Sequence, residues 1–205
     1  MSEESDLGRE AAIFRTADGA LVVEVRLVTG ATPDVKPLIA EAKAAGAELL
    51  WVHGDGVEET LGFRRRGGYA RLAAEQLPDP VVLPSPRHSL IRELQMDCGS
   101  GVWGHSEPGV PDPSATYVGL HEGGRWVGVC EFDADAGWID GPGVIRELRT
   151  PDRYARLVRG AAARMKRGAV TLETWGDADE TIAAYQQLGF RLVSYVPGWE
   201  LSLRS

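Results

Sequence analysis

The chain has 205 residues, of which 43% are hydrophobic and 25% are charged, an ordinary composition for a globular protein. Its formal net charge of −8 at pH 7 excludes sequence-independent binding to nucleic acid or to an anionic membrane, because both need a basic surface. Two cysteines, Cys98 and Cys130, are too few for a disulfide framework, and no apolar run approaches the roughly 20 residues of a membrane span. The start of the sequence, 1–10, is acidic and polar, unlike a signal peptide. We therefore expect a cytoplasmic protein.

The first half of the sequence alternates strand and helix signals. Residues 12–16 and 21–28 are expected to pair as a hairpin around an Asp-Gly turn. A helix should follow, with Thr32 as its N-cap and Gly46 as its stop. Residues 47–53 then have the composition of a strand.

The middle of the chain carries weaker signals. Residues 77–87 are rich in proline and extended, which indicates a linker or a crossover. The stretch HSLIRELQM at 88–96 is compatible with either a strand or a short helix. Residues 97–114 have the glycine and proline content of a loop. This region is expected to separate two halves of the chain.

The second half begins with three strand signals and a helix. Residues 116–121 and 125–133 should form a hairpin, and 137–145 should form a third strand. The Gly-Pro-Gly sequence at 141–143 indicates a bulge or a local splay in that strand. An amphipathic helix is expected over 151–167.

The end of the chain has the clearest local order. A buried strand is expected over 169–174, followed by a helix that Asp177 or Asp179 can cap. Gly189 suits the left-handed residue after that helix, and Phe190 opens a further run of strand-forming residues. This region therefore predicts strand, turn, helix and strand.

Three segments recur in the same order in the two halves and indicate an internal repeat. They are TPD at 32–34 and 150–152, GAELLWVHG from Gly46 and GAVTLETWG from Gly168, and ETLGF ending at Phe63 and QQLGF ending at Phe190. Each TPD precedes a predicted helix, and each LGF precedes a predicted strand. The chain is therefore interpreted as two related halves.

The segment AAYQQLGF at 183–190, set between a strand and a further strand run, resembles the closing signature of the GNAT acyltransferase superfamily. That signature is a strand, a short helix and a hairpin. The resemblance covers about 116–203, and with the repeat the chain is most similar to tandem GNAT proteins of the mycothiol-synthase type. It implies an α/β (α+β) fold of two GNAT-like units, with mixed sheets flanked by helices. The units would be a truncated one at 1–80 and a second at 116–205, joined by a linker and loop at 81–115.

The resemblance further implies acetyl-CoA or another acyl-CoA as co-substrate, held in a splay between the fourth and fifth strands of the family. The pyrophosphate would lie at the N-terminus of the main helix, where free N–H groups and the helix dipole favour anions. Alignment with the family loop places Arg149 on the family arginine. Arg153 and Arg156 would complete an anion site, and Ile145 would line the cofactor-binding strand.

The same loop departs from the family pattern. Thr150, Asp152 and Tyr154 stand where the family has glycines. A carboxylate about 4 Å from a phosphate charge costs ~4 kcal/mol at an effective dielectric constant near 20. Two interpretations of the local sequence therefore stay open: a replacement anion site, or a capped helix whose arginines form a solvated face.

For catalysis, Tyr185 matches the family tyrosine that protonates the departing CoA thiolate. Asp140 is the expected base for an amine acceptor, and Glu131 on the preceding strand is the reserve. The alternatives are a packing tyrosine and solvent-facing carboxylates. The four histidines have no metal-ligand spacing, so no metal is expected.

These residues favour an acyl-CoA-dependent N-acyltransferase that moves an acyl group directly to an amine of a small molecule or peptide. The alternative is a catalytically inactive GNAT-derived binding or scaffold protein. A CoA-independent binder that uses the space between the halves is a third class. No nucleic-acid or membrane partner is expected, and the sequence does not define the acceptor, the acyl chain or the oligomeric state.

Overall fold

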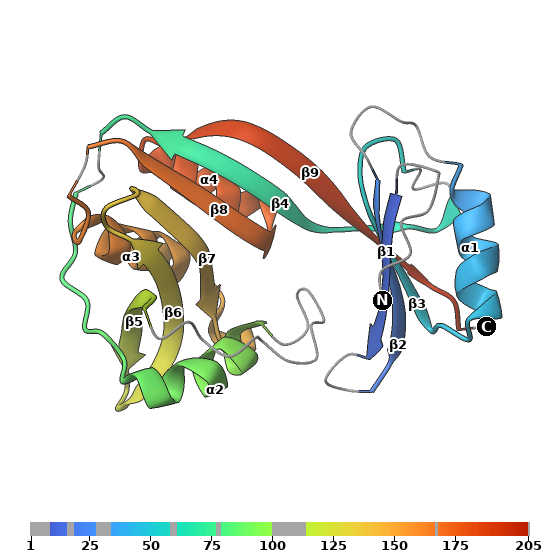
Figure 1. Ribbon diagram of the computed structural model, residues 1–205, viewed down its shortest axis with the longest axis horizontal. Helices are drawn as coiled ribbons and strands as arrows, with labels where there is room; N and C mark the ends of the chain where they lie inside the picture. The colour runs from blue at the N-terminus through green and yellow to red at the C-terminus, as the bar shows by residue number, and fades with distance from the viewer. Residues whose placement is uncertain are drawn as a thin grey trace.

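A single mixed β-sheet runs through the computed structural model of the chain (Figure 1). The structure describes residues 9–15, 19–27, 34–57, 61–76, 79–99, 114–166 and 168–204. Within these ranges the fold is α+β, as predicted, with nine strands and four α-helices, although two separate units are not evident in the one sheet. No helix in this part of the chain is long and apolar enough to cross a membrane. In chain order the elements are β1 (Arg9–Arg15), β2 (Leu21–Leu27), α1 (Val35–Ala44), β3 (Leu49–His53), β4 (Arg64–Ala74), α2 (His88–Gly99), β5 (Thr116–Glu122), β6 (Arg125–Asp133), β7 (Trp138–Val144), a 3₁₀ turn (Arg146–Leu148), α3 (Pro151–Ala162), β8 (Val170–Asp177), α4 (Asp179–Gln187) and β9 (Arg191–Ser202).

The strand order is β1-β2-β3-β9-β4-β8-β7-β6-β5, with the long antiparallel pair β9–β4 at its centre. On one side β9 is antiparallel to β3, which is parallel to β2, which is antiparallel to β1. On the other side β4 is antiparallel to β8, which is parallel to β7, which is antiparallel to β6. The pattern of strand directions is therefore the same when read outward from the centre in either direction.

The first half forms largely as the sequence predicts. Strands β1 and β2 pair antiparallel, as expected for a hairpin, while its predicted turn at 16–18 lies outside the described residues. The N-cap of α1 is Asp34, whose carboxylate accepts a hydrogen bond from the Lys36 amide at 3.1 Å. Asp34 is therefore the N-cap in place of the predicted Thr32, because its carboxylate already satisfies the first turn, and Thr32 itself lies outside the described residues. Gly46 follows α1 with a left-handed φ of 73°, as its stop signal requires.

Two helices, one from the middle of the chain and one from its second half, differ in extent from the prediction. The stretch that fitted either a strand or a short helix is α2, and it lies against β6 and β7. Helix α3 begins as predicted, with the Thr150 hydroxyl accepting from the Arg153 amide and Pro151 in the first turn. It ends at Ala162, five residues before the predicted 167.

The last three elements correct the predicted boundaries. Strand β8 runs on to Asp177 instead of ending at 174. The N-cap of α4 is Ala178, which has no side-chain acceptor, so the prediction of Asp177 or Asp179 as the cap was wrong. Gly189 has the expected left-handed φ of 96°. Strand β9 is one continuous strand paired with β3 and β4, so the hairpin implied by the family resemblance does not form.

Buried hydrophobic residues form two clusters, one in each half of the sheet. The larger cluster is built from β4 to β9 with α2, α3 and α4, and it includes Leu72 of β4. The smaller cluster is built from β2, β3 and α1, and Leu201 of β9 packs against it. A Cβ at Gly128 would meet α3, whereas one at Gly143 would meet α2, so these helices cover opposite faces of the sheet. Strand β4, from the first half of the chain, thus contributes to the larger cluster. Strand β9, from the second half of the chain, contributes to the smaller one.

Candidate functional site

Strands β7 and β8 separate part of the way along their length. Their parallel register ends at the pair Asp140–Glu173. Beyond it, β7 continues through 141–144 with β6 as its partner, while β8 continues through 174–177 with β4 as its partner. We call this opening the strand gap. It begins at the Gly-Pro-Gly sequence, where the β6–β7 register also shifts, so the predicted bulge or splay is confirmed.

Thr174 is the first residue of β8 inside the strand gap. Its side chain is fully buried, on the same face of β8 as Leu172. The Oγ1 atom has no hydrogen-bond partner, and within the described ranges it is the one buried side-chain oxygen or nitrogen in that condition. A polar atom without a partner therefore lies where the sheet opens.

Three carboxylates lie side by side on the opposite face, one on each of β6, β7 and β8. Glu131 is paired with Asp140, and Asp140 with Glu173. We call these three residues the carboxylate row. The structure thus brings together the two predicted bases, Asp140 and Glu131, and adds Glu173, which the sequence interpretation missed. Neighbouring strand residues point to opposite faces of a sheet. Because Leu172 is apolar, the sequence could have predicted that Glu173 lies on the opposite, polar face.

Polar side chains flank both ends of the carboxylate row. The Tyr117 hydroxyl donates to Glu131 Oε2 at 3.0 Å, and Arg71 forms an ion pair with Glu173 at 2.9 Å. Tyr69 is also hydrogen-bonded to Glu173, and its burial together with this contact raises the Tyr69 pKa to about 12. Neighbouring like charges on adjacent strands repel one another, and Arg71 supplies a counter-charge at the Glu173 end of the row.

Tyr185 lies away from the carboxylate row. It belongs to α4, is fully buried and is part of the larger hydrophobic cluster. Helices α3 and α4 are in contact and cover the same face of the sheet (Figure 1). Thr174 lies on that face, because strand pairing places Leu172 beside Ile139 and Ile139 beside Phe132, which points to the same face of β6 as Gly128, opposite α3. The predicted acid, Tyr185, and the predicted bases, Asp140 and Glu131, therefore lie on opposite faces of the sheet.

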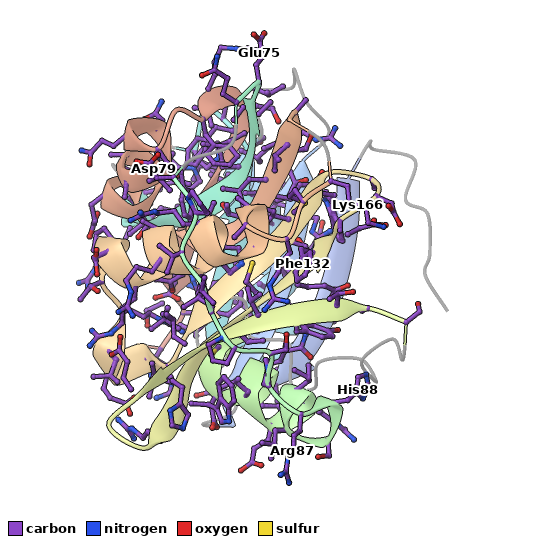
Figure 2. All side chains as sticks on the ribbon, turned by 90° about the vertical axis from the view of Figure 1, so that its left-hand side faces the viewer. Glu75, Asp79, Arg87, His88, Phe132 and Lys166 are labelled. Atoms are coloured by element: carbon purple, nitrogen blue, oxygen red, sulfur yellow. The ribbon has the colours of Figure 1, made fainter. Side chains whose placement is uncertain are left out.

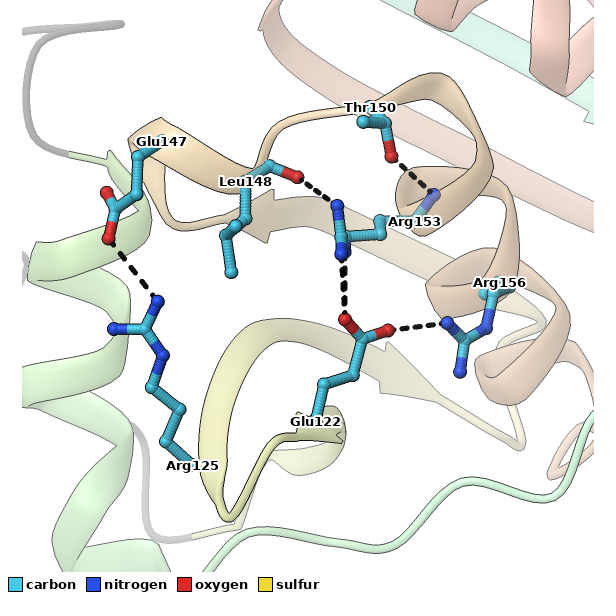
Figure 3. Close-up of polar contacts among 7 residues, drawn as sticks. All are labelled: Glu122, Arg125, Glu147, Leu148, Thr150, Arg153 and Arg156. Atoms are coloured by element: carbon cyan, nitrogen blue, oxygen red, sulfur yellow. Dashed lines mark hydrogen bonds and ion pairs between the residues drawn. The ribbon is translucent and has the colours of Figure 1, made fainter.

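Two of the three predicted anion-binding arginines are already bound to a carboxylate of the chain (Figure 3). Arg153 contacts Glu122 Oε2 at 2.9 Å, and Arg156 contacts Glu122 Oε1 at 2.6 Å. Arg153 also donates to the Leu148 carbonyl at 2.9 Å. The hydrogen bond from Arg153, followed by that from Arg156, lowers the pKa of Glu122. Glu122 was not anticipated, because it lies about thirty residues away on β5 and meets the arginines only through the fold.

The remaining predicted cofactor residues are used in local structure. Arg149 donates to the carbonyls of Val144 at 3.1 Å and Cys98 at 2.7 Å, and so ties the end of β7 to the end of α2. Ile145 is buried, and its amide donates to the Val127 carbonyl at 3.0 Å. Asp152 is exposed in the first turn of α3. The N-terminus of α3 therefore presents a carboxylate, and the neighbouring cations have partners.

Other candidates lie apart from the strand gap. A cavity of about 920 Å³ is lined by the first residues of β8 and by residues that include Glu75 and Asp79, both labelled in Figure 2. It contains none of the predicted site residues. Cys98 is buried, which raises its pKa to about 12 and makes it unreactive. Within the described ranges no three His, Cys, Asp or Glu residues are placed to hold a metal ion, and His105 lies outside those ranges.

The fold has counterparts among solved structures. A protein described as "Putative Acetyltransferase" from Pyrococcus horikoshii is 9% identical, with a TM-score of 0.52 over 95% of this chain and 69% of that one. A functionally unknown conserved protein from Staphylococcus epidermidis is 12% identical, with a TM-score of 0.52 over 98% and 94%. A GCN5-related N-acetyltransferase from Anabaena variabilis is 10% identical, with a TM-score of 0.49 over 95% and 60%. No protein-family model and no curated protein matches the sequence. At these identities the likeness is one of fold.

The contact of Glu122 with the two arginines predicts a specific pH dependence of stability. Because the folded-state pKa of Glu122 is lowered from 4.5, the contact stabilises the fold above that pH and its contribution is lost as the pH falls through the lowered value. Glu122→Gln should reduce the free energy of unfolding at pH 7 by about 0.5–1 kcal/mol, measured by urea denaturation.

The difference between wild type and Glu122→Gln should shrink below pH 4.5. Glu147→Gln is the matched control, because Glu147 forms an exposed ion pair with Arg125 at 3.7 Å in the same region (Figure 3). That variant should differ little from wild type at any pH. A Glu122→Gln penalty that stays constant down to pH 3 would contradict the assignment.

Proposed function

We propose that the chain is a GNAT-type N-acyltransferase that uses acetyl-CoA or another acyl-CoA and transfers the acyl group directly to an amine. The strand gap carries this proposal. Strands β7 and β8, with α3 between them in the chain, have the order of the fourth and fifth strands of the family, between which acyl-CoA lies. Backbone groups that face a gap have no strand partner on that side, so they can bind the amides of a pantetheine arm. The likeness of fold to the Pyrococcus horikoshii protein described as a "Putative Acetyltransferase" supports the same proposal.

We further propose that the chain arose from two GNAT-like units, 1–80 and 116–205, with 81–115 as the linker and loop. The repeated sequences map onto α1 and α3, onto β3 and β8, and onto the entries to β4 and β9. The matching strand directions on the two sides of β4–β9 support this division. In this arrangement β4 and β9 are equivalent strands, and each lies next to the fifth strand of the other unit.

Only the second unit retains an open site under this proposal. The repeat makes Val52 of β3 equivalent to Thr174. The pairs Glu24–Trp51 and Asp140–Glu173 then make Glu24 of β2 equivalent to Asp140. In the first unit the parallel pairing continues past this point, through Val25–Val52 and Arg26–His53. The second unit has no such pairs. The closed pairing of β2 and β3 leaves no room between them, so a single acyl-CoA site per chain is expected.

The proposed reaction divides the work between the two faces of the sheet. The carboxylate row attracts the protonated amine of a small molecule or peptide. Asp140, directly or through a water, accepts a proton from that amine, with Glu131 as the reserve. The neutral nitrogen attacks the thioester carbonyl, a C–N bond forms and the C–S bond breaks. Tyr185 supplies the proton that the departing sulfur takes. The attacking nitrogen, which carries an extra proton once the C–N bond has formed, loses that proton to solvent, and solvent returns a proton to the tyrosine.

The alternative is a catalytically inactive binding or scaffold protein of the same descent. It is favoured by the N-terminus of α3, where Asp152 is exposed and Glu122 occupies Arg153 and Arg156. An acyl-CoA pyrophosphate would have to compete with Glu122 for these arginines. In either case we expect a cytoplasmic protein with no membrane or nucleic-acid partner.

Calorimetric titration with acetyl-CoA tests the proposed binding. We expect a saturable heat and a rise in melting temperature, because a ligand that binds only the folded state stabilises it. Absence of heat and of a thermal shift with acetyl-CoA and with longer acyl-CoAs would contradict the proposal. Binding without release of free CoA, across a panel of primary amines, would favour the inactive alternative.

If turnover is found, two substitutions test the assigned roles. Asp140→Asn should lower kcat by about 10²-fold or more and leave the acetyl-CoA affinity unchanged, because a general base acts on the acceptor. Tyr185→Phe should also lower kcat without weakening acetyl-CoA binding. Glu93→Gln, an exposed carboxylate on α2, is the control and should match wild type. An unchanged rate in either variant would remove that residue from the mechanism.

A further inference from the structure

The buried hydroxyl of Thr174 makes no hydrogen bond to the part of the chain that the structure describes. Its Oγ1 is inaccessible to solvent and has no hydrogen-bond partner among the described residues. A buried hydroxyl without a partner destabilises a folded protein relative to an apolar group of the same shape. Valine has nearly the same shape as threonine, so valine would be the more stable choice if packing alone mattered.

The other half of the chain shows that this position can be apolar. Val52 stands at the equivalent place in the repeat, and it is also fully buried. There β2 and β3 are paired and no gap exists. The hydroxyl therefore occurs in the half whose strands separate, and valine occurs in the half whose strands stay paired.

We propose that the Thr174 hydroxyl donates a hydrogen bond to a carbonyl oxygen of the acyl-pantetheine arm bound in the strand gap. The inference rests on the proposed function and adds a ligand-positioning residue to it. An acyl-pantetheine arm carries two amide carbonyls and the thioester carbonyl, all of which need donors once water is excluded. Thr174 lies at the opening of the gap, on the face of the sheet that α3 covers, and α3 is in contact with α4, the helix that carries Tyr185. A hydroxyl that has no hydrogen-bond partner in the free protein lowers the stability of the fold. If the ligand supplies that partner, the new hydrogen bond increases the affinity for the ligand.

The variant Thr174→Val separates these two effects. In the free protein it should raise the melting temperature by about 2–4 °C, because the unsatisfied hydroxyl is removed. By calorimetry it should weaken acetyl-CoA binding by about fivefold, the loss of roughly one hydrogen bond. Binding of adenosine 3′,5′-bisphosphate, which lacks the pantetheine arm, should be unchanged.

Two further variants serve as matched controls. Thr174→Ser keeps the hydroxyl and should keep the wild-type affinity for acetyl-CoA. Val52→Thr places a hydroxyl at the equivalent closed position, so it should lower the melting temperature and leave the acetyl-CoA affinity unchanged.

The outcomes distinguish this inference from the proposed function. If wild type binds acetyl-CoA and Thr174→Val binds it equally tightly, the role of Thr174 is refuted while the acyl-CoA site stands. The role of Thr174 is likewise refuted if Thr174→Ser loses as much affinity as Thr174→Val. If wild type itself binds no acyl-CoA, the proposed function fails and this inference fails with it.

Discussion

Backbone pairing is the constraint on which the candidate site depends. Within a sheet each strand needs partners on both sides for its N–H and C=O groups, and a strand that lacks one leaves those groups to water or to a ligand. Strand β8 has β4 as a partner along its whole length but has β7 only as far as Glu173. Pro142 has no N–H to offer to a neighbouring strand, and the flanking glycines let β7 turn away. The opening therefore follows from the local sequence of β7.

The central pair of long strands explains how the rest of the molecule holds this opening in place. Strands β4 and β9 run across the centre of the sheet and join its two halves (Figure 1). Gly198 of β9 lies against the backbone of Gly67 in β4, where a Cβ would collide with the carbonyl oxygen. Arg66 stacks on the ring of Trp51 at 3.5 Å and contacts Glu200 at 3.1 Å, which links β4, β3 and β9. Strand β8 is therefore paired with β4 along its length, whereas beyond Glu173 it has no pairing with β7.

The sequence predicts the local structure better than the long-range contacts. The Gly-Pro-Gly splay, the Thr150 cap and the left-handed Gly189 follow from backbone preferences of a few adjacent residues, and the structure has all three. The single strand β9 was not predicted, because its partner is β4, more than a hundred residues earlier in the chain. The pairing of Glu122 with Arg153 and Arg156 has the same origin, since no local pattern places β5 beside α3. Glu173 was missed although its alternation with Leu172 was visible in the sequence.

The central claim is that acyl-CoA occupies the gap between β7 and β8. Hydrogen–deuterium exchange with and without saturating acetyl-CoA tests it most directly, because it reports on the backbone groups that lack a strand partner. The account predicts slower exchange in peptides covering β7 and β8, 141–144 and 174–177, with no change over 49–53 of β3, where the equivalent strands are already paired. Protection that appears elsewhere, with the exchange of β7 and β8 unaltered, would contradict it.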